Sequence, residues 1–366
     1  MDVNLNNTNG SSQEQLQERK RRIMQKTEYS QKKALRMPGT GLDLGTMQLV
    51  AATMSNPDSI TYKTQRDAFL DVDNNIMSKN MLNKMNCSYI ESTDKKQLYV
   101  IGDQALQLAS FFNKECRRPF SKGVISTREK EALSMIKIIM HGLVGDPIIE
   151  NEKLFFSSPA DPIDADFNNI YHENVLKSFL KSFGFNAEPI NEAFAIVWSD
   201  LEDEGYTGLA ISCGAGQVNL ALSLMGMSEK KQQFSIARSG DWIDEQAANA
   251  VGLKASRITM LKEAGIDLLN PKNREEIAIK IYYENLVNYV CNCIETKFKD
   301  QELNFNEPIT VVISGGTSKA INFDKLFEQE LRTKTLPFEI NLVKKAIDPL
   351  NAVAKGCLLN ALATLK

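Results

Sequence analysis

A strand that breaks into a glycine turn recurs three times along this 366-residue chain. The three segments are 41–46, 209–220 and 311–317, so the first and the last lie about 270 residues apart. Short apolar runs of this kind are typical of buried strands, and glycine beside a small hydroxyl residue lets backbone N–H groups approach a phosphate or a nucleoside. Three such turns in this order divide the chain into two halves and indicate a nucleotide clamped between two domains.

The composition is that of a folded protein of two ordinary domains. With 366 residues and 43% hydrophobic content, the chain can bury a large core. Its apolar stretches are short and its N-terminus is charged, which predicts a cytoplasmic protein without a signal peptide or a membrane span. The six scattered cysteines form no C-x-x-C pair and there are two histidines, so neither a zinc site nor a disulfide framework is supported.

A basic segment precedes the first strand. Residues 13–36 hold eight basic and three acidic side chains, and a Pro38-Gly39 breaker follows them. We expect residues 1–40 to form a disordered or loosely helical tail outside the fold. Two interpretations stay open: a solvated appendage, or an electrostatic contact with anionic lipid, nucleic acid or an acidic partner. The net charge of −3 argues against nucleic-acid binding over the whole surface, and no sequence-specific binding is expected.

Beyond residue 40, strand-like and helix-like segments alternate, which predicts an α/β fold. The expected strands are 41–51, 98–101, 154–157, 208–212, 218–224, 233–236 and 309–314. The expected helices are 102–112, 126–141, 166–183, 191–200, 242–251, 255–263, 274–298 and 352–365. In the longest helix the apolar residues at helical spacing are Ile277, Ile281, Leu286, Tyr289, Val290 and Ile294. A strand, a glycine turn and a second strand recur near residues 45 and 215, as two related half-molecules would show.

On these residues the chain resembles the actin-like ATPase superfamily, and within it the bacterial MreB-type cytoskeletal proteins. The segment Gly41-Leu42-Asp43-Leu44-Gly45-Thr46 is similar to the family's first phosphate loop, and residues 313–318 are similar to its adenosine-contacting turn. The segment 348–356 is similar to the last connecting helix. The resemblance implies an actin-like fold of two related α/β domains with a nucleotide cleft between them. The first domain would span 41–190, closed by the C-terminal helix 350–366, and the second 191–349.

The resemblance also implies roles for particular residues. Asp43 would hold, through water, the Mg²⁺ that accompanies the phosphates, and Glu192 would be the catalytic group that positions the attacking water. Lys262 and Glu263 match the family's ribose- and base-contacting pair. Two alternatives stay open: a helix-dipole role for Glu192, and a plain surface pair for Lys262 and Glu263. The full expected nucleotide-binding set is Asp43, Gly45, Thr46, Met47, Gly214, Ala215, Gly216, Gln217, Gly240, Lys262, Glu263, Gly315, Gly316, Thr317 and Ser318.

The second phosphate loop departs from the family pattern. The family begins this loop with an aspartate and follows its glycines with threonine, whereas this chain has Ser212 at the first place and Gln217 and Val218 after the glycines. Loss of one contact to the metal, the water or the terminal phosphate costs about 2–4 kcal/mol of barrier. We expect nucleotide binding to survive through the glycine amides. Hydrolysis should be slow or depend on assembly, unless Ser212 and Gln217 replace the lost groups by binding water.

The function that the resemblance implies is a cytoplasmic, actin-like cytoskeletal protein that binds ATP or ADP with Mg²⁺. It would form filaments from head-to-tail copies of itself. One alternative is a nucleotide-binding scaffold or regulator with little or no ATPase activity, which the altered loop favours. Another is a small-molecule kinase of the same superfamily, although the chain shows no extra substrate subdomain and no general-base aspartate in the second loop. Peripheral attachment to the inner face of the membrane through segment 13–36 is a further expectation. The choice between ATP and GTP stays open.

Overall fold

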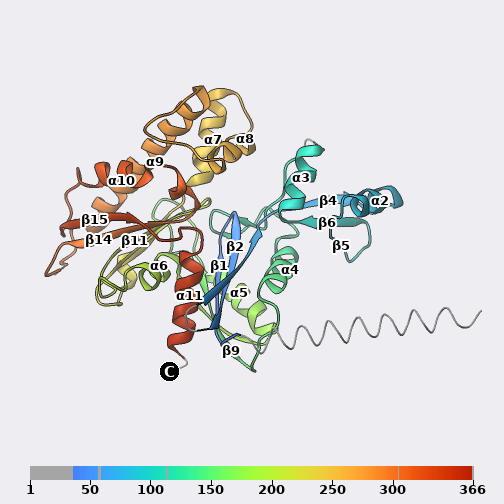
Figure 1. Cartoon of the computed structure of the whole chain (residues 1–366), viewed down its shortest axis with the longest axis horizontal. Coiled ribbons are helices and arrows are strands. Elements are labelled where there is room, and N and C mark those ends of the chain that lie inside the picture. Colours follow the sequence, from blue (N-terminus) through green and yellow to red (C-terminus); the bar gives the residue numbers. More distant parts are fainter. Residues whose placement is uncertain (1–35, 57–58, 113, 304, 365–366) are drawn as a thin grey trace, which may run out of the picture.

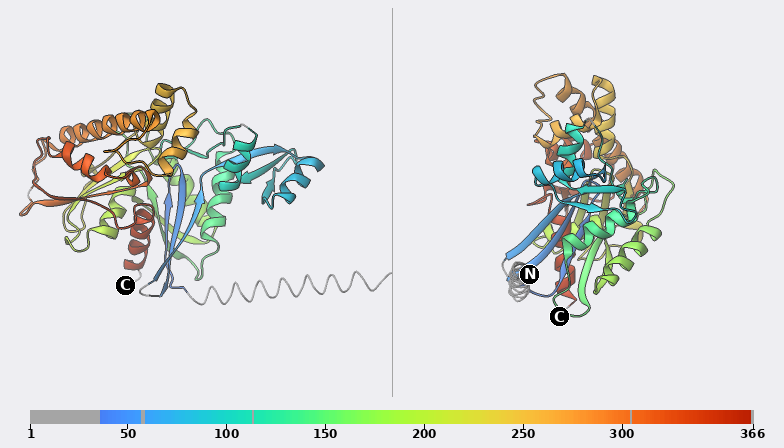
Figure 2. Two further views of the ribbon diagram at one scale, coloured as in Figure 1. Left: turned by 45° about the horizontal axis from the view of Figure 1, so that its top comes forward. Right: turned by 90° about the vertical axis from the view of Figure 1, so that its right-hand side faces the viewer.

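The computed structural model describes residues 36–56, 59–112, 114–303 and 305–364. Most of the tail expected over residues 1–40 lies outside these ranges. Two sheets stand side by side with helices around them, and a smaller sheet projects from the first (Figure 1). Figure 2 shows the same projection from a second direction.

The first sheet has the strand order β10-β9-β1-β2-β3. β1 (Thr40–Leu44), β2 (Gln48–Asn56) and β3 (Ser59–Arg66) are antiparallel neighbours, and β9 (Glu152–Ser158) and β10 (Phe185–Asn191) run parallel to β1. The single strand expected over 41–51 is therefore wrong, because the chain reverses at residues 45–47 and forms a hairpin. Helices α4 (Ala132–Val144) and α5 (Ile170–Ser182) complete its core, and both begin later than expected.

The second sheet repeats this arrangement. Its order is β13-β12-β11-β14-β15. β11 (Gly208–Cys213), β12 (Val218–Ser223) and β13 (Gln233–Ile236) are antiparallel neighbours, and β14 (Ile309–Ser314) and β15 (Ile340–Lys345) run parallel to β11. The predicted recurrence near residues 45 and 215 is confirmed, since both places are hairpin turns in equivalent positions of two sheets with one topology.

Four helices accompany the second sheet: α7 (Gly240–Val251), α8 (Ala255–Glu263), α9 (Arg274–Phe298) and α10 (Phe323–Leu331). The 3₁₀ turns η1 (Lys230–Gln232) and η2 (Gly316–Lys319) lie in its connections. The predicted apolar face of α9 is partly wrong. Ile277 and Ile281 are 48% and 46% exposed, whereas Ile279 and Tyr283 are buried. The buried stripe continues from these two residues through Leu286 and Val290.

The projecting sheet joins β4 (Phe69–Asp73), β6 (Gln97–Ile101) and β5 (Tyr89–Glu91). Helices α2 (Ile76–Lys84) and α3 (Asp103–Phe111) pack on it around a small core of its own. A short hairpin of β7 (Phe120–Ser121) and β8 (Val124–Ile125) leads back to the first sheet.

Two helices connect the sheets below the space between them. α6 (Glu192–Asp200) and α11 (Ala352–Ala363) cross closely, and α11 also packs on β1 (Figure 1). A Cβ atom at Gly356 would overlap the carbonyl oxygen of Ala195, and one at Gly41 would overlap the backbone of Ala354 and Leu358. Glycine is therefore needed at both crossings. None of the described helices combines the length and apolar character that crossing a membrane requires.

Candidate functional site

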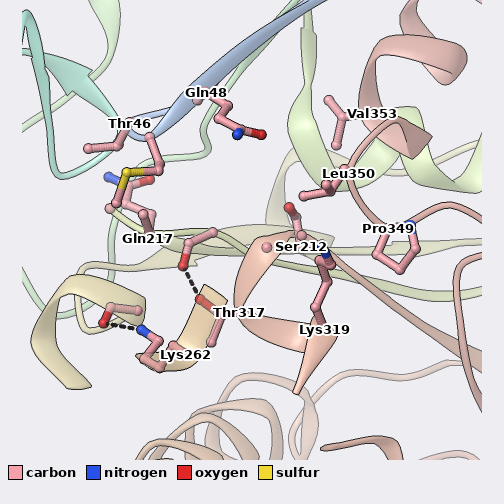
Figure 3. Close-up of a pocket in the computed structure, with 18 of the residues that line it drawn as sticks. Thr46, Gln48, Ser212, Gln217, Lys262, Thr317, Lys319, Pro349, Leu350 and Val353 are labelled. Carbon is pink, nitrogen blue, oxygen red and sulfur yellow. Dashed lines mark hydrogen bonds between the residues drawn. The ribbon is translucent and has the colours of Figure 1, made fainter. Parts of the chain in front are cut away.

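A cavity of about 400 Å³ opens between the two sheets. Of the fifteen residues expected to bind nucleotide, fourteen line it, and so do Glu192 and Ser212 (Figure 3). The exception is Ser318, which is fully buried and donates a hydrogen bond to the Gly315 carbonyl at 2.8 Å. Ser318 therefore holds the turn after β14 together and does not face the cavity.

The β1–β2 and β11–β12 turns meet across this cavity. The amide of Gly123, in the β7–β8 turn, donates to Thr46 Oγ1 at 2.9 Å. A Cβ atom at Gly216 would overlap Thr46 Oγ1 and lie close to the Gly123 amide. Glycine at position 216 thus lets the turn of the second half lie directly against the turn of the first.

Several backbone amides of these turns are free to bind an anion. The Gly214 amide is not among them, because it donates to the Gln217 carbonyl at 3.0 Å within the turn. Within the described ranges, the turn amides that donate to no protein acceptor are those of Gly45, Thr46, Met47, Ala215, Gly216 and Gln217. Converging N–H groups of this kind form an anion-binding concavity.

Two carboxyl groups face the same cavity, each held by a serine of a neighbouring strand. Asp43, in β1, accepts a hydrogen bond from Ser157 Oγ at 2.8 Å. Glu192, the first residue of α6, accepts from Ser212 Oγ at 2.6 Å and from Asn219 Nδ2 at 2.8 Å. Ser212, which replaces the family's aspartate, is thus a hydrogen-bond donor to the predicted catalytic group.

Both carboxyl groups lie deep between the sheets, although the cavity leaves them partly accessible. Burial raises the pKa of Asp43 to about 6. Burial and the neighbouring Asp43 raise the pKa of Glu192 to about 8, against the lowering effect of the Ser212 hydrogen bond. Glu192 is also the acidic residue in the first turn of α6, so the helix-dipole interpretation stays open. In the absence of a cation the two groups hinder each other's ionisation.

A second cluster of polar side chains is carried by α7 and α8. Lys262 Nζ lies 2.8 Å from Asp244 Oδ1 and donates to the Gly240 carbonyl at 2.9 Å (Figure 3). Thr259 Oγ1 donates to the other Asp244 oxygen at 2.7 Å. Burial raises the pKa of Asp244, and the Lys262 ammonium opposes that shift. Sequence reasoning missed Asp244, although it lies one helical turn after Gly240 and therefore on the same side of α7.

An ion pair across the cavity joins the two halves. Arg66, at the end of β3, binds both carboxylate oxygens of Glu263 at 3.1 and 3.3 Å. Arg118 and Asp241, which do not line the cavity, form a further ion pair at 3.1 Å between the same two halves. Lys262 and Glu263 are therefore not a plain surface pair with each other, since each has another partner. Nothing in the local sequence marks Arg66 as a lining residue, because its partner lies 197 positions away.

Other lining residues could be found from the sequence only in part. Gln48 and Val50 alternate along β2, so they share the face that its strand period turns to the cavity. Pro349, Leu350 and Val353 lie in the segment that resembles the last connecting helix. The remaining lining residues that we did not predict are Leu44, Gly123, Thr259, Gly265, Tyr283, Lys319 and Ala320.

Comparison with known proteins identifies the family. The Volactin family model matches residues 38–361. No curated protein matches the chain.

Among solved structures, the chain is similar to the MamK double helical filament, with 16% identity over 88% of this chain and 98% of that one and a TM-score of 0.67. MreB 5 of Spiroplasma citri bound to AMPPNP is 18% identical over 87% of this chain and 94% of that one, with a TM-score of 0.60. Ethanolamine utilization protein EutJ from Carboxydothermus hydrogenoformans is 13% identical over 88% and 90%, with a TM-score of 0.52. Identities this low show the fold alone. The chain belongs to the Volactin family and has the actin-like fold that its resemblance to MreB-type proteins predicted.

Proposed function

We propose that this protein binds ATP or ADP with Mg²⁺ in the cavity between its two sheets, hydrolyses ATP slowly, and assembles head-to-tail into filaments. One observation carries the proposal. Backbone amides without a protein acceptor, from two equivalent glycine turns, line one cavity together with two partly buried carboxyl groups. The amides suit phosphate oxygens, and the carboxyl groups suit the cation that accompanies a polyphosphate.

The residues fit a hydrated Mg²⁺ better than a metal bound by the protein alone. Within the described chain, no group of three or more His, Cys, Asp or Glu side chains could hold a metal ion. Mg²⁺ commonly takes one or two carboxylates, keeps several waters and completes its shell with phosphate oxygens. Asp43 would hold it through water, and its raised pKa reflects burial without such a cation. When bound, the ion would neutralise charge on the phosphates.

Glu192 is the residue that we assign to the attacking water. Its two oxygens are fixed by Ser212 and Asn219, so the carboxyl group cannot rotate freely. A cation nearby favours the ionised form, and an ionised carboxylate can accept a hydrogen bond from a water and polarise it. Slow hydrolysis is expected because Ser212 offers no carboxylate of its own. The same feature supports the second candidate, a scaffold that binds nucleotide with little hydrolysis.

Filament formation is supported by relatives of the same fold. MamK is described as a double helical filament. We propose that copies of this chain contact one another head-to-tail, because a heterologous contact that does not close produces a filament. MreB 5 of Spiroplasma citri has been solved with both AMPPNP and ADP, which supports a nucleotide as the ligand here.

Peripheral attachment through the basic segment 13–36 stays a proposal for a cytoplasmic protein. All of this segment except Arg36 lies outside the described residues. Arg36 binds both carboxylate oxygens of the buried Glu152, at 2.7 and 2.9 Å, so its charge is already paired inside the fold. Only the other seven basic residues of the segment remain for a membrane or an acidic partner.

The test is ultracentrifugation with and without Mg-ATP, with phosphate release followed in the same samples. We expect nucleotide-dependent pelleting and slow release. Glu192→Gln should reduce release while leaving nucleotide binding intact, because it removes a base without touching the amides. Pelleting without release would favour a filament whose nucleotide is structural. Neither pelleting nor release, with nucleotide bound, would favour the monomeric scaffold.

A further inference from the structure

Gln217 has a buried side chain without hydrogen-bond partners. It ends the turn after β11, lines the cavity and is 3% exposed. Both its Oε1 and its Nε2 are buried, and neither has a partner among the described residues. Buried amide groups are nearly always hydrogen-bonded, so this arrangement calls for an explanation.

The Gln217 side chain crosses from the second half to the first. A Cβ atom at Gly123 would lie 2.8 Å from Gln217 Cδ and 3.0 Å from its Oε1, so the carboxamide lies against the β7–β8 turn. In Figure 3 Gln217 lies beside Thr46. Since Gly123 also donates to Thr46, the carboxamide is packed where the two phosphate-type turns meet.

Gln217 lies close in the chain to residues that we assign to the phosphate and to the attacking water. It directly follows Ala215 and Gly216, whose amides are free to bind an anion. It directly precedes β12, the strand that carries Asn219. Asn219 in turn holds Glu192. Along the chain, Gln217 therefore lies between amides suited to a phosphate and a residue that holds the group assigned to the water.

Among the described side chains that line the cavity, one other has a buried polar atom without a hydrogen bond. That atom is Asp244 Oδ1, and the Lys262 ammonium lies 2.8 Å from it. Its charge is thus compensated within the protein. Gln217 has no such compensation and offers both a donor and an acceptor.

We propose that Gln217 makes the cavity prefer a nucleoside triphosphate over a diphosphate. Its amide group donates to an oxygen of the terminal phosphate or to a water held on it, and its carbonyl group accepts from such a water. This inference rests on the proposed function. It also links the terminal phosphate to the contact between the two halves, because both polar atoms of the carboxamide are buried against the first half and reach that ligand only when this contact changes.

The experiment compares the dissociation constants of AMPPNP and ADP, each with Mg²⁺, by isothermal titration. Gln217→Met keeps the length of the side chain and removes both polar groups. We expect it to weaken AMPPNP binding about tenfold, in the range for a hydrogen bond to a charged group, and to change ADP binding less than about twofold. Gln217→Glu should weaken AMPPNP binding further, because it places a negative charge beside the phosphate. Gln301→Met, outside the cavity lining, is the control and should leave both constants unchanged.

The melting temperature without nucleotide provides an independent readout. Gln217→Met should leave it unchanged or raise it, since the substitution removes two unsatisfied buried groups. A lower melting temperature, or an equal change in both dissociation constants, would assign Gln217 a packing role and overturn the proposal. Wild-type protein that binds neither nucleotide would instead remove the proposed function. Normal binding with an unchanged AMPPNP-to-ADP ratio in both variants would remove the role of Gln217 alone.

Discussion

Between pH 7.5 and pH 5 the free energy of unfolding of this protein should fall by about 2 kcal/mol less when His172 is replaced by glutamine. His172 lies in α5 and is 2% exposed. Its Nδ1 accepts a hydrogen bond from the Ile125 amide at 3.2 Å, so in the neutral ring the proton is on Nε2, which has no partner among the described residues. A second proton would have to go to Nδ1, and that would break the bond to β8. The β7–β8 hairpin carries Gly123, so the same bond helps to position the turn that contacts Thr46.

The size of the expected stability change follows from the shift in the pKa of His172. Burial lowers the pKa of His172 from 6.5 to about 4. Because the folded pKa is below the unfolded one, the unfolded chain binds more protons between these values. The contribution of neutral His172 to the free energy of unfolding is therefore complete above pH 6.5 and is lost as the pH falls towards 4. One pKa unit corresponds to about 1.36 kcal/mol, so the full loss is about 3.4 kcal/mol, and about 2 kcal/mol of it occurs by pH 5.

Urea unfolding followed by circular dichroism at both pH values measures this difference. Glutamine keeps an acceptor for the Ile125 amide and does not titrate in this range. Asp43 and Glu192, whose raised pKa values act in the opposite direction, are present in both proteins, so their effect cancels in the comparison. His141→Gln is the matched control, because the His141 side chain is 53% exposed. If the free energy of unfolding fell by the same amount in wild type and His172→Gln, within about 0.5 kcal/mol, the reasoning would be refuted.

Three further changes have defined outcomes. Gly41→Ala should destabilise the fold by about 3 kcal/mol in thermal unfolding, since the new Cβ atom would overlap the backbone of α11. Gly142→Ala, whose Cβ atom would meet no atom within 4 Å, should stabilise α4 by up to about 1 kcal/mol. Similar effects of the two substitutions would contradict the close crossing. A double-mutant cycle of Arg66→Met and Glu263→Gln on nucleotide dissociation should give a coupling of about 1 kcal/mol that weakens with salt, and additive effects would show that the pair does not hold the cleft. Asp43→Ala should weaken nucleotide binding at least about tenfold with Mg²⁺ and much less without it, as titration calorimetry would show; unchanged binding would disprove the site assignment.

The parts of the fold that could be predicted from the sequence are those in which side-chain pattern and backbone geometry coincide. β11 and β14 are mostly apolar strands that glycine follows directly, and their predicted positions are confirmed. The predicted helix over 274–298 is confirmed, yet its buried face was predicted only in part. Apolar residues occur on two sides of α9, and only the packing of the second sheet decides which side is covered.

The strands that sequence reasoning missed are mainly edge strands and members of the projecting sheet. β3 reads Ser-Ile-Thr-Tyr-Lys-Thr-Gln-Arg and β15 reads Ile-Asn-Leu-Val-Lys-Lys, so neither is a continuous apolar run. An edge strand is held largely by backbone hydrogen bonds to one neighbour and exposes much of its surface. Its side chains therefore carry little of the pattern from which a strand is predicted.

For the site, the glycine turns were sufficient to predict three of the segments that line the cavity. They were not sufficient to predict the ion pairs that cross it. Arg66 and Glu263 become neighbours only after two halves have folded and approached each other. Such contacts depend on long-range packing, and no local spacing encodes them.

The altered second loop changes the balance of charge in the cavity as well as its contacts. Asp43 is held by Ser157 and Glu192 by Ser212, so each half contributes one carboxyl group and one serine donor. An aspartate at position 212 would place a third acidic group beside two whose pKa values are already raised. With serine there, the cavity is less negative, and a polyphosphate meets less repulsion before a cation arrives. Under the proposed function, the loop that would reduce hydrolytic power would therefore also favour retention of the nucleotide. Both effects would favour a protein in which bound nucleotide keeps the two halves together for longer than a fast ATPase would allow.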